Sequence, residues 1–312
     1  MLVWALVLFV LFWALVRTLG LEAGFPLVPL LSFTPYVAAA ALVPVGLALI
    51  ARRWLPLGLA LVATFALALA VVPRTRPAPL PAAARDGTPL RVVSANAFIG
   101  EVDARALVRF LEREIVDVLA VQELTPQFAA ELERAGILGL LPNTELVPRR
   151  GPLGAGLYAA FPLRRVGSLE RQVRGTRAPI AELRLPSGSS AQVIVAHPDP
   201  PSSPDQVAGW TEGLAAIPAP RDRIPTIVAG DFNATLDHAA LRRVLDRGYV
   251  DAAAARGMGL SPTWPSGVLL PPPVTIDHIL VSRRIGVADV ETHLLEGSDH
   301  RALSAELLVP TR

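Results

Sequence analysis

The apolar residues of this chain form long uninterrupted runs near the N-terminus and short runs separated by polar residues elsewhere. The stretches 1–16, 23–51 and 54–73 contain no charged side chain. About 20 apolar residues cross the hydrocarbon core of a bilayer as a helix. This pattern predicts a membrane domain over residues 1–73. Its three expected transmembrane helices cover 2–19, 34–51 and 54–72.

A cleaved signal peptide is the alternative for the first run. Such a peptide begins with a basic segment, whereas here no basic residue precedes Arg17 and more apolar sequence follows at once. We therefore expect a multi-pass protein of the cell membrane. The very short Arg52-Arg53 connection favours the cytoplasmic side, which predicts a cytoplasmic N-terminus and an extracytoplasmic C-terminal domain.

The pattern of apolar and polar residues changes after the third apolar run. The stretch from Pro73 to Pro89 contains five prolines, both ends included, and predicts an extended, semi-rigid linker, assigned to residues 74–89. Short apolar runs then alternate with amphipathic stretches over 90–312, which predicts an α/β domain. The expected strands are 90–96, 116–121, 156–160, 180–185, 191–196, 226–229, 276–281 and 303–308, and the expected helices are 103–114, 204–217, 237–247 and one beginning at Thr125-Pro126.

The amino-acid composition agrees with a membrane protein and excludes some kinds of functional site. Charged residues make up 18% of the chain, against about 25% in soluble proteins. Cysteine is absent, which excludes disulfides and thiolate metal sites. The chain has 29 basic residues, all arginine, and a net charge of +2. Residues 81–312 contain 24 arginines and 26 acids, so the predicted domain is slightly acidic, which weighs against non-specific binding of duplex nucleic acid.

Short acids, amides and imidazoles stand at the ends of six predicted strands. Each has an ordinary explanation by itself, such as a turn former or a helix cap, but six together favour a functional site, because loops at strand ends collect the chemistry of α/β folds. Carboxylate and amide oxygens suit a hard cation such as Mg²⁺, and histidines suit phosphate contact and proton transfer. The candidates are Asn96, Glu123, His197, Asp231, Asn233, Asp277, Asp299 and His300.

The motifs that carry these residues are specific in their order and spacing, although each is weak alone. They are Ser94-Ala95-Asn96, Val121-Gln122-Glu123, Gly156-Leu157-Tyr158, Val195-Ala196-His197, Gly230-Asp231-Phe232-Asn233, Thr263-Trp264, Ile276-Asp277-His278 and Ser298-Asp299-His300-Arg301. Over residues 90–309 the chain resembles the endonuclease/exonuclease/phosphatase superfamily of metal-dependent phosphoesterases, and its three preceding helices are similar to those of membrane-bound bacterial members. The resemblance implies a DNase I-like four-layer α/β sandwich with the site at one edge.

The resemblance also implies a role for each candidate. Glu123 would be the main ligand of Mg²⁺ or Mn²⁺, with Asn96 beside it and Asp299 nearby. Asp231 and Asn233 would align the attacking water and the phosphate. His300, oriented by Asp277, and His197 would contact the phosphate, activate water or assist the leaving group.

Other positions depart from the family or are given ordinary roles. Phe98 stands where some nucleases carry a second acid, which favours one metal over two. Tyr158 is expected in the core, Trp264 as support for the site, and His238 and His293 at the surface. Arg174 and Arg177 are expected on a solvated face.

The expected function is hydrolysis of a phosphoester at a membrane, by a phosphodiesterase or phosphatase. Apolar residues Val268, Leu269 and Leu270 could touch lipid or fold back onto the domain, and a lipid-linked substrate is preferred to nucleic acid. A surface nuclease and a catalytically silent scaffold of the same fold are the alternatives. The sequence leaves the substrate and the oligomeric state open.

Overall fold

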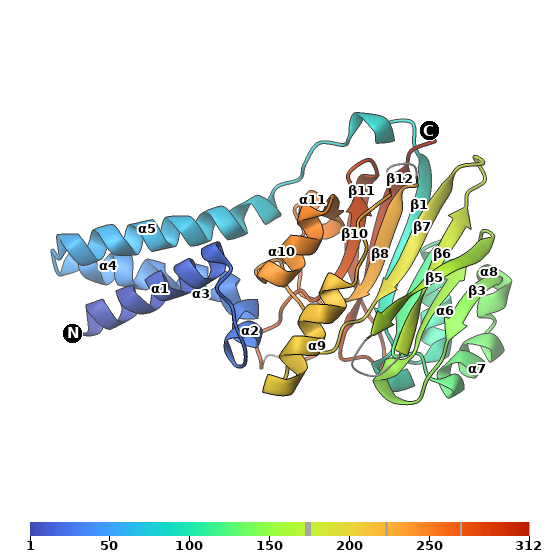
Figure 1. Ribbon diagram of the computed structural model, residues 1–312, viewed down its shortest axis with the longest axis horizontal. Coiled ribbons are helices and arrows are strands. Elements are labelled where there is room, and N and C mark those ends of the chain that lie inside the picture. The colour runs from blue at the N-terminus through green and yellow to red at the C-terminus, as the bar shows by residue number, and fades with distance from the viewer. Residues whose placement is uncertain (172–175, 222–223, 269, 312) are drawn as a thin grey trace.

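The computed structural model describes residues 1–171, 176–221, 224–268 and 270–311, and joins a group of apolar helices to an α/β domain (Figure 1). Three N-terminal stretches are long and apolar enough to cross a membrane: Leu2–Leu19, Leu27–Ile50 and Trp54–Thr75. We call residues 1–75 the N-terminal helical region. Its helices are α1 (Leu2–Leu19), α2 (Leu27–Leu30), α3 (Thr34–Ala40), α4 (Leu42–Ile50) and α5 (Trp54–Val71), with 3₁₀ turns at Leu31–Phe33 and Val72–Thr75.

The second stretch begins earlier than the sequence predicts, at Leu27 instead of residue 34. Its prolines explain why the start is hard to recognise. Pro29 and Pro35 lie in the first turns of α2 and α3, where a backbone N–H has no partner within the helix, so proline is tolerated there.

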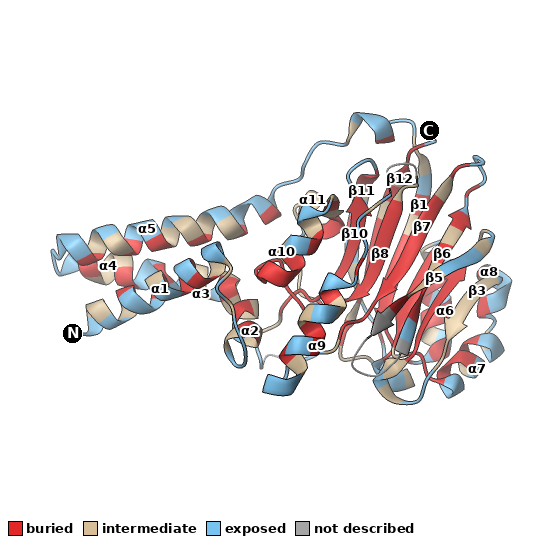
Figure 2. Cartoon of the chain, in the orientation of Figure 1, coloured by how far each residue is buried: buried red, intermediate tan, exposed pale blue. Residues whose placement is uncertain are grey.

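Helices α1, α4 and α5 have exposed outward faces (Figure 2), and large apolar side chains make up much of these faces. Phe12, Leu55 and Phe65 are more than half exposed, whereas Trp13 and Leu67 are buried between the helices. Soluble proteins rarely expose so much contiguous apolar surface. The helices are therefore compatible with membrane spans.

The α/β domain contains two mixed six-stranded sheets flanked by helices, which is the DNase I-like sandwich that the sequence predicts (Figure 1). The first sheet has the order β11-β12-β1-β2-β4-β3 and the second β5-β6-β7-β8-β10-β9. The strands of the first are β11 (Gly286–Leu294), β12 (Arg301–Val309), β1 (Thr88–Asn96), β2 (Val118–Gln122), β4 (Ala155–Ala159) and β3 (Asn143–Val147). Those of the second are β5 (Leu163–Arg171), β6 (Thr176–Arg184), β7 (Ser190–Ala196), β8 (Thr226–Asp231), β10 (Asp277–Ser282) and β9 (Tyr249–Asp251).

Successive side chains along each strand pack into different layers of the sandwich. In β1, Val92 packs into the core between the sheets, and its neighbour Val93 packs on the outer side against Leu107 and Phe110 of α6. Since successive strand residues point to opposite faces, a strand covered on both sides becomes a continuous apolar run. The helices are α6 (Ala104–Arg113), α7 (Pro126–Arg134) and α8 (Ile137–Leu140) by the first sheet, and α9 (Pro204–Ala215), α10 (Ala239–Asp246) and α11 (Ala252–Ala255) by the second.

The topology brings the ends of the central strands to one edge. β1 and β2 are parallel, β7 and β8 are parallel, and β10 and β12 run antiparallel to their neighbours β8 and β1. The carboxyl ends of the first four strands therefore meet the beginnings of the last two. Asp277 lies opposite Asp231 in the register of β10 and β8.

All eight expected strands are present, with ends that differ by a few residues, but β3, β5, β9 and β11 were not expected. Charged residues interrupt the apolar pattern of β5 and β11, and β9 has only three residues, so none of these three strands gives a buried-strand signal. At the start of α7, Thr125 Oγ1 accepts a hydrogen bond from Phe128 N at 3.1 Å, which confirms the predicted cap.

The proline-rich segment 74–89 contacts the α/β domain at several points, although most of its residues are exposed. Ala78 N donates to Ala255 O at 2.8 Å, and Gly259 N donates to Arg74 O at 3.1 Å. Ala84 is fully buried. These contacts limit how far the two parts of the chain can move apart.

Polar contacts also join the N-terminal helical region to α10. Arg17 and Arg74 both pair with the buried Asp237, which precedes this helix. His238 Nε2 lies 2.9 Å from Val28 O. The surface position predicted for His238 is wrong: the ring is 1% exposed because the segment that contains Val28 covers it.

Candidate functional site

All eight predicted site residues meet at the edge where the central strands end. Asn96 and Asp231 are the last residues of β1 and β8, and Glu123 and His197 directly follow β2 and β7. Asp277 begins β10. Asn233 follows β8, and Asp299 and His300 directly precede β12.

Glu123 is held in position by backbone and amide hydrogen bonds. Ile99 N donates to its Oε2 at 2.8 Å, and Asn96 Nδ2 lies 3.4 Å from its Oε1. Its backbone has a φ of 57°, in the left-handed region that residues other than glycine seldom adopt. Burial raises the pKa of this carboxyl, while the hydrogen bond from Asn96 lowers it.

Asp231 is the centre of the cluster. Its Oδ2 accepts a hydrogen bond from Asn96 Nδ2 at 3.1 Å, and its Oδ1 accepts one from the backbone N of Asn233 at 2.8 Å. The Asn233 side chain donates to Pro198 O at 3.1 Å, which ties the two loops together. Burial raises the pKa of Asp231 to about 7.

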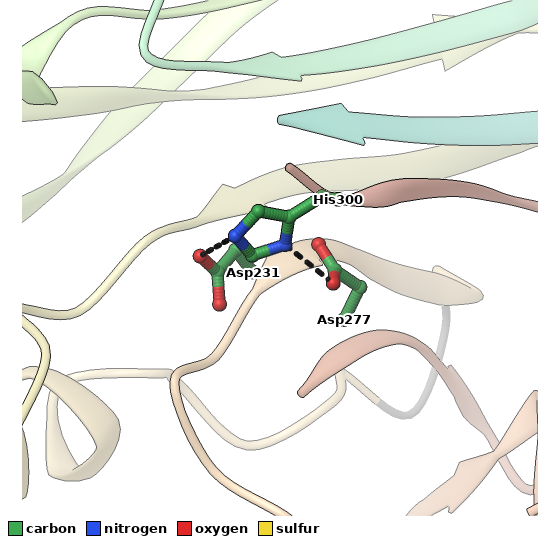
Figure 3. A group of neighbouring side chains, drawn as sticks. All are labelled: Asp231, Asp277 and His300. Carbon is green, nitrogen blue, oxygen red and sulfur yellow. Dashed lines mark hydrogen bonds and ion pairs between the residues drawn. The ribbon is translucent and has the colours of Figure 1, made fainter. Parts of the chain in front are cut away.

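His300 lies between two carboxylates, one facing each ring nitrogen (Figure 3). Its Nδ1 is 2.8 Å from Asp277 Oδ2, and its Nε2 is 3.8 Å from Asp231 Oδ2. Burial alone would lower the pKa of His300, but the charges of Asp277 and Asp231 outweigh it and raise the pKa to about 10. The imidazole is therefore a cation at neutral pH in this arrangement.

His197 faces the same acids from the other side. Its Nε2 lies 3.8 Å from Glu123 Oε1 and 3.7 Å from Asp231 Oδ2. Two imidazoles thus point their Nε2 atoms at one carboxylate. A tetrahedral anion next to Asp231 would be within reach of both.

Asp299 is placed by Trp264, whose Nε1 donates to Asp299 Oδ2 at 3.0 Å. Ser298 Oγ donates to Asn96 O at 2.9 Å and accepts from His300 N at 3.0 Å, so it links the loop before β12 to the end of β1. The sequence indicated a supporting role for Trp264 but gave no sign of the bridge made by Ser298.

Comparison of the sequence with protein-family models identifies the family to which the chain belongs. The model described as the Endonuclease/Exonuclease/phosphatase family matches residues 93–300, from within β1 to His300. The chain belongs to this family. The endonuclease/exonuclease/phosphatase (EEP) superfamily consists in general of metal-dependent phosphoesterases.

Solved structures show the same fold. The EEP protein from Beutenbergia cavernae DSM 12333 has a TM-score of 0.56 at 16% identity, over 71% of this chain and 72% of that one. D. rerio TDP2 complexed with a single-strand DNA product has a TM-score of 0.57 at 19% identity, over 70% of this chain and 99% of that one. The Bacteroides thetaiotaomicron mannosyl-6-phosphatase Bt3783 has a TM-score of 0.50 at 16% identity, over 70% and 99% of the two chains. No curated protein matches the sequence significantly.

The donor set of this EEP site suits a divalent cation. Asp231, Asp277 and His300 offer ligand atoms within 4.8 Å of one another and could hold a metal ion. The Oδ1 atoms of Asp277 and Asp299 are buried and accept no hydrogen bond from any residue that the structure describes. Four carboxylates meet here with two imidazoles, so a divalent cation would lower the free-energy cost of keeping all four charged. The amide nitrogen of Asn96 faces Glu123 and Asp231, whereas its oxygen accepts a hydrogen bond from Phe98 N at 2.9 Å, so the oxygen would reach a cation between those carboxylates only after the amide rotates.

The remaining polar residues singled out in the sequence have structural positions. His278 points away from the site, with its ring nitrogens 2.7 Å from Asp251 Oδ2 and 2.8 Å from Ala234 O. Tyr158 is fully buried, as expected. His293, which was expected at the surface, is partly exposed there: its ring packs 4.7 Å from Phe110 and its Nε2 lies 2.9 Å from Ser304 Oγ. Arg177 is exposed, and Arg174 lies outside the described residues.

Proposed function

We propose that this chain is a membrane-anchored phosphoesterase that depends on Mg²⁺ or Mn²⁺. The observation that carries the proposal is the convergence of four carboxylates, two amides and two imidazoles on one edge of an EEP sandwich. The apolar faces of α1, α4 and α5 support anchoring in a bilayer. A silent scaffold would have no need to keep so many buried ionisable groups together, since each costs free energy to bury.

Glu123 and Asp299 are the proposed metal ligands, with Asn96 beside them. Glu123 is fixed by Ile99 N, and Asp299 by Trp264, so both carboxylates are oriented before a cation binds. A bound divalent cation would supply a Lewis acid that neutralises negative charge on the phosphate oxygens.

The other residues are proposed to handle the phosphate and the water. Asp231, held by Asn96 and the backbone of Asn233, orients the attacking water and can accept its proton. His300 donates a charged N–H to a phosphate oxygen while its Nδ1–H is held by Asp277. His197 faces the same position and is suited to the leaving-group oxygen.

A lipid-linked phosphoester is the preferred substrate, and nucleic acid is the alternative. Val268 and Leu270 are exposed, at 54% and 81%, as expected of residues that touch lipid, and Leu269 lies outside the described residues. The likeness to TDP2 shows the fold alone at 19% identity.

The proposal is tested with the full-length protein reconstituted in vesicles. Phosphate or headgroup release from a phospholipid panel is compared with nicking of plasmid DNA, with Mg²⁺, with Mn²⁺ and with EDTA. Metal-dependent release from lipid supports the proposal. Efficient nicking with no lipid product would establish the nuclease alternative, and failure of every substrate with either metal would establish the silent scaffold.

A further inference from the structure

A cavity of about 540 Å³ lies over the site, within the size range of small-molecule pockets, about 300–1,000 Å³. Part of its lining is the ionisable cluster, with Glu123, His197, Asp231 and His300. The rest is largely apolar. A molecule that fills this cavity would present a charged group to the cluster and an apolar group to the other walls.

One of the apolar walls does not come from the EEP domain. Pro29 lies in α2, and Phe33 lies in the 3₁₀ turn that follows, so both belong to the N-terminal helical region. Leu153, Pro200 and Pro271 of the EEP domain are further apolar residues of the same cavity. The cavity is thus shared between the two parts of the chain.

Hydrogen bonds fix this wall on both sides. Just before Pro29, the carbonyl of Val28 is 2.9 Å from His238 Nε2. Just after Phe33, Tyr36 OH donates to Pro273 O at 2.7 Å. Hydrogen bonds to the EEP domain therefore hold this wall of the cavity in place.

Exposed apolar residues flank the cavity lining along the chain. Leu30 and Leu270, the chain neighbours of Pro29 and Pro271, are 42% and 81% exposed. The second candidate span begins at Leu27, beside this wall. A nucleic acid would place its charged backbone against these apolar groups, which would cost its hydration without compensation.

We infer that the N-terminal helical region forms part of the substrate-binding site. Phe33 and Pro29 hold the first part of the hydrocarbon chain of a membrane lipid phosphoester, whose phosphate faces the Nε2 atoms of His197 and His300. This inference rests on the proposed function and adds to it the residues that select the lipid substrate. Phe33 is a specificity residue and takes no part in the chemical step.

The test measures kcat/KM of the full-length protein in detergent for two series of soluble substrates with alkyl chains from methyl to dodecyl. One series consists of 4-nitrophenyl alkyl phosphodiesters and the other of alkyl phosphate monoesters, both below their micellar concentrations. Each methylene that enters the cavity should raise kcat/KM by about threefold to fourfold, the hydrophobic gain of one buried methylene. The rise should stop once the chain extends beyond the walls.

Phe33→Ala and Pro29→Ala should flatten this dependence of kcat/KM on chain length. Phe65→Ala is the matched control, because Phe65 is an exposed phenylalanine on α5 that does not line the cavity. Hydrolysis of the methyl substrate with no dependence on chain length, or with equal dependence in wild type and Phe33→Ala, would overturn the inference and leave the proposed function standing. Hydrolysis of no member of either series would refute the proposed function itself.

Discussion

Arg74 and Asp237 form a two-point hydrogen-bonded ion pair between the end of the N-terminal helical region and the EEP domain. Arg74 Nη1 is 2.8 Å from Asp237 Oδ2, and Nη2 is 2.6 Å from Oδ1. Arg17 Nε, at the end of α1, is 3.1 Å from the same Oδ1. One buried carboxylate therefore joins the first and the last candidate spans to the domain that carries the site.

Replacing the Asp237 carboxylate should lower the stability of the full-length protein. Asp237→Ala leaves two arginines without their buried partner, and removing one member of a buried ion pair typically costs about 3–5 kcal/mol. The thermal unfolding midpoint of the full-length protein in detergent should fall clearly. Asp246→Ala, at an exposed position in the same segment, should leave the midpoint unchanged. An equal fall in both variants would show that the ion pairs of Asp237 do not stabilise the protein.

The same pair predicts how stability depends on pH. Burial would raise the pKa of Asp237, but the hydrogen bonds and charges of Arg74 and Arg17 outweigh it and hold the pKa below its ordinary value. A carboxyl whose pKa is depressed by folding contributes its full stability above the unfolded pKa, about 3.9, and loses it as the pH falls through the folded value. The other charged groups nearby are Arg242, Glu22 and His238.

The difference in unfolding midpoint between wild type and Asp237→Asn should therefore be constant from about pH 7 to about pH 5 and shrink only below about pH 4. Thermal unfolding at a series of pH values measures it. A difference that already disappears between about pH 7 and pH 5 would show that the folded pKa of Asp237 is not depressed.

The polar residues at the strand ends could be predicted from the sequence, but the contacts between distant segments could not. Asn96, Glu123 and Asp231 could be recognised because each follows an apolar run, and parallel neighbouring strands bring such positions together. Nothing local distinguishes Asp237 from an ordinary residue before a helix. Its partners Arg17 and Arg74 are 220 and 163 residues away in the chain.

The same limit explains the misplaced histidine and the unrecognised cavity wall. His238 looks like a surface residue until the segment that contains Val28 covers it. Pro29 and Phe33 lie in the predicted membrane domain, in the uncharged stretch just before the second expected span. Only their place in space shows that they face the site.

Asp277 should act on the rate through His300. Asp277→Asn removes the acceptor charge that holds His300 Nδ1–H, and a positioned acid or base typically contributes about 10²–10⁴-fold to the rate. We expect kcat to fall in this range while the unfolding midpoint changes little. Asp251→Asn is the matched control, because Asp251 holds His278 in a second buried pair that points away from the site.

In that control the unfolding midpoint should fall and kcat should be retained per folded molecule. If Asp251→Asn and Asp277→Asn reduce rate and stability in parallel, the pair of Asp277 and His300 is a structural pair as well and its positioning role is refuted.

The proposed orientation can be measured because the chain has no cysteine. Ser187→Cys places a thiol in the exposed turn between β6 and β7, and Ala51→Cys places one at the exposed connection before α5. A membrane-impermeant maleimide should label Ser187→Cys in intact cells and Ala51→Cys only after lysis. The opposite labelling would put the EEP domain in the cytoplasm.

The central claim is that this edge of the sandwich hydrolyses phosphoesters with a metal held by Glu123. The most direct measurement is the Mg²⁺ or Mn²⁺ dependence of lipid phosphoester hydrolysis by full-length wild type, Glu123→Ala and the exposed control Glu133→Ala. The account predicts that Glu123→Ala lowers the rate by about 10²–10³-fold and requires more metal, whereas Glu133→Ala matches wild type. Wild-type rate and metal dependence in Glu123→Ala would contradict it.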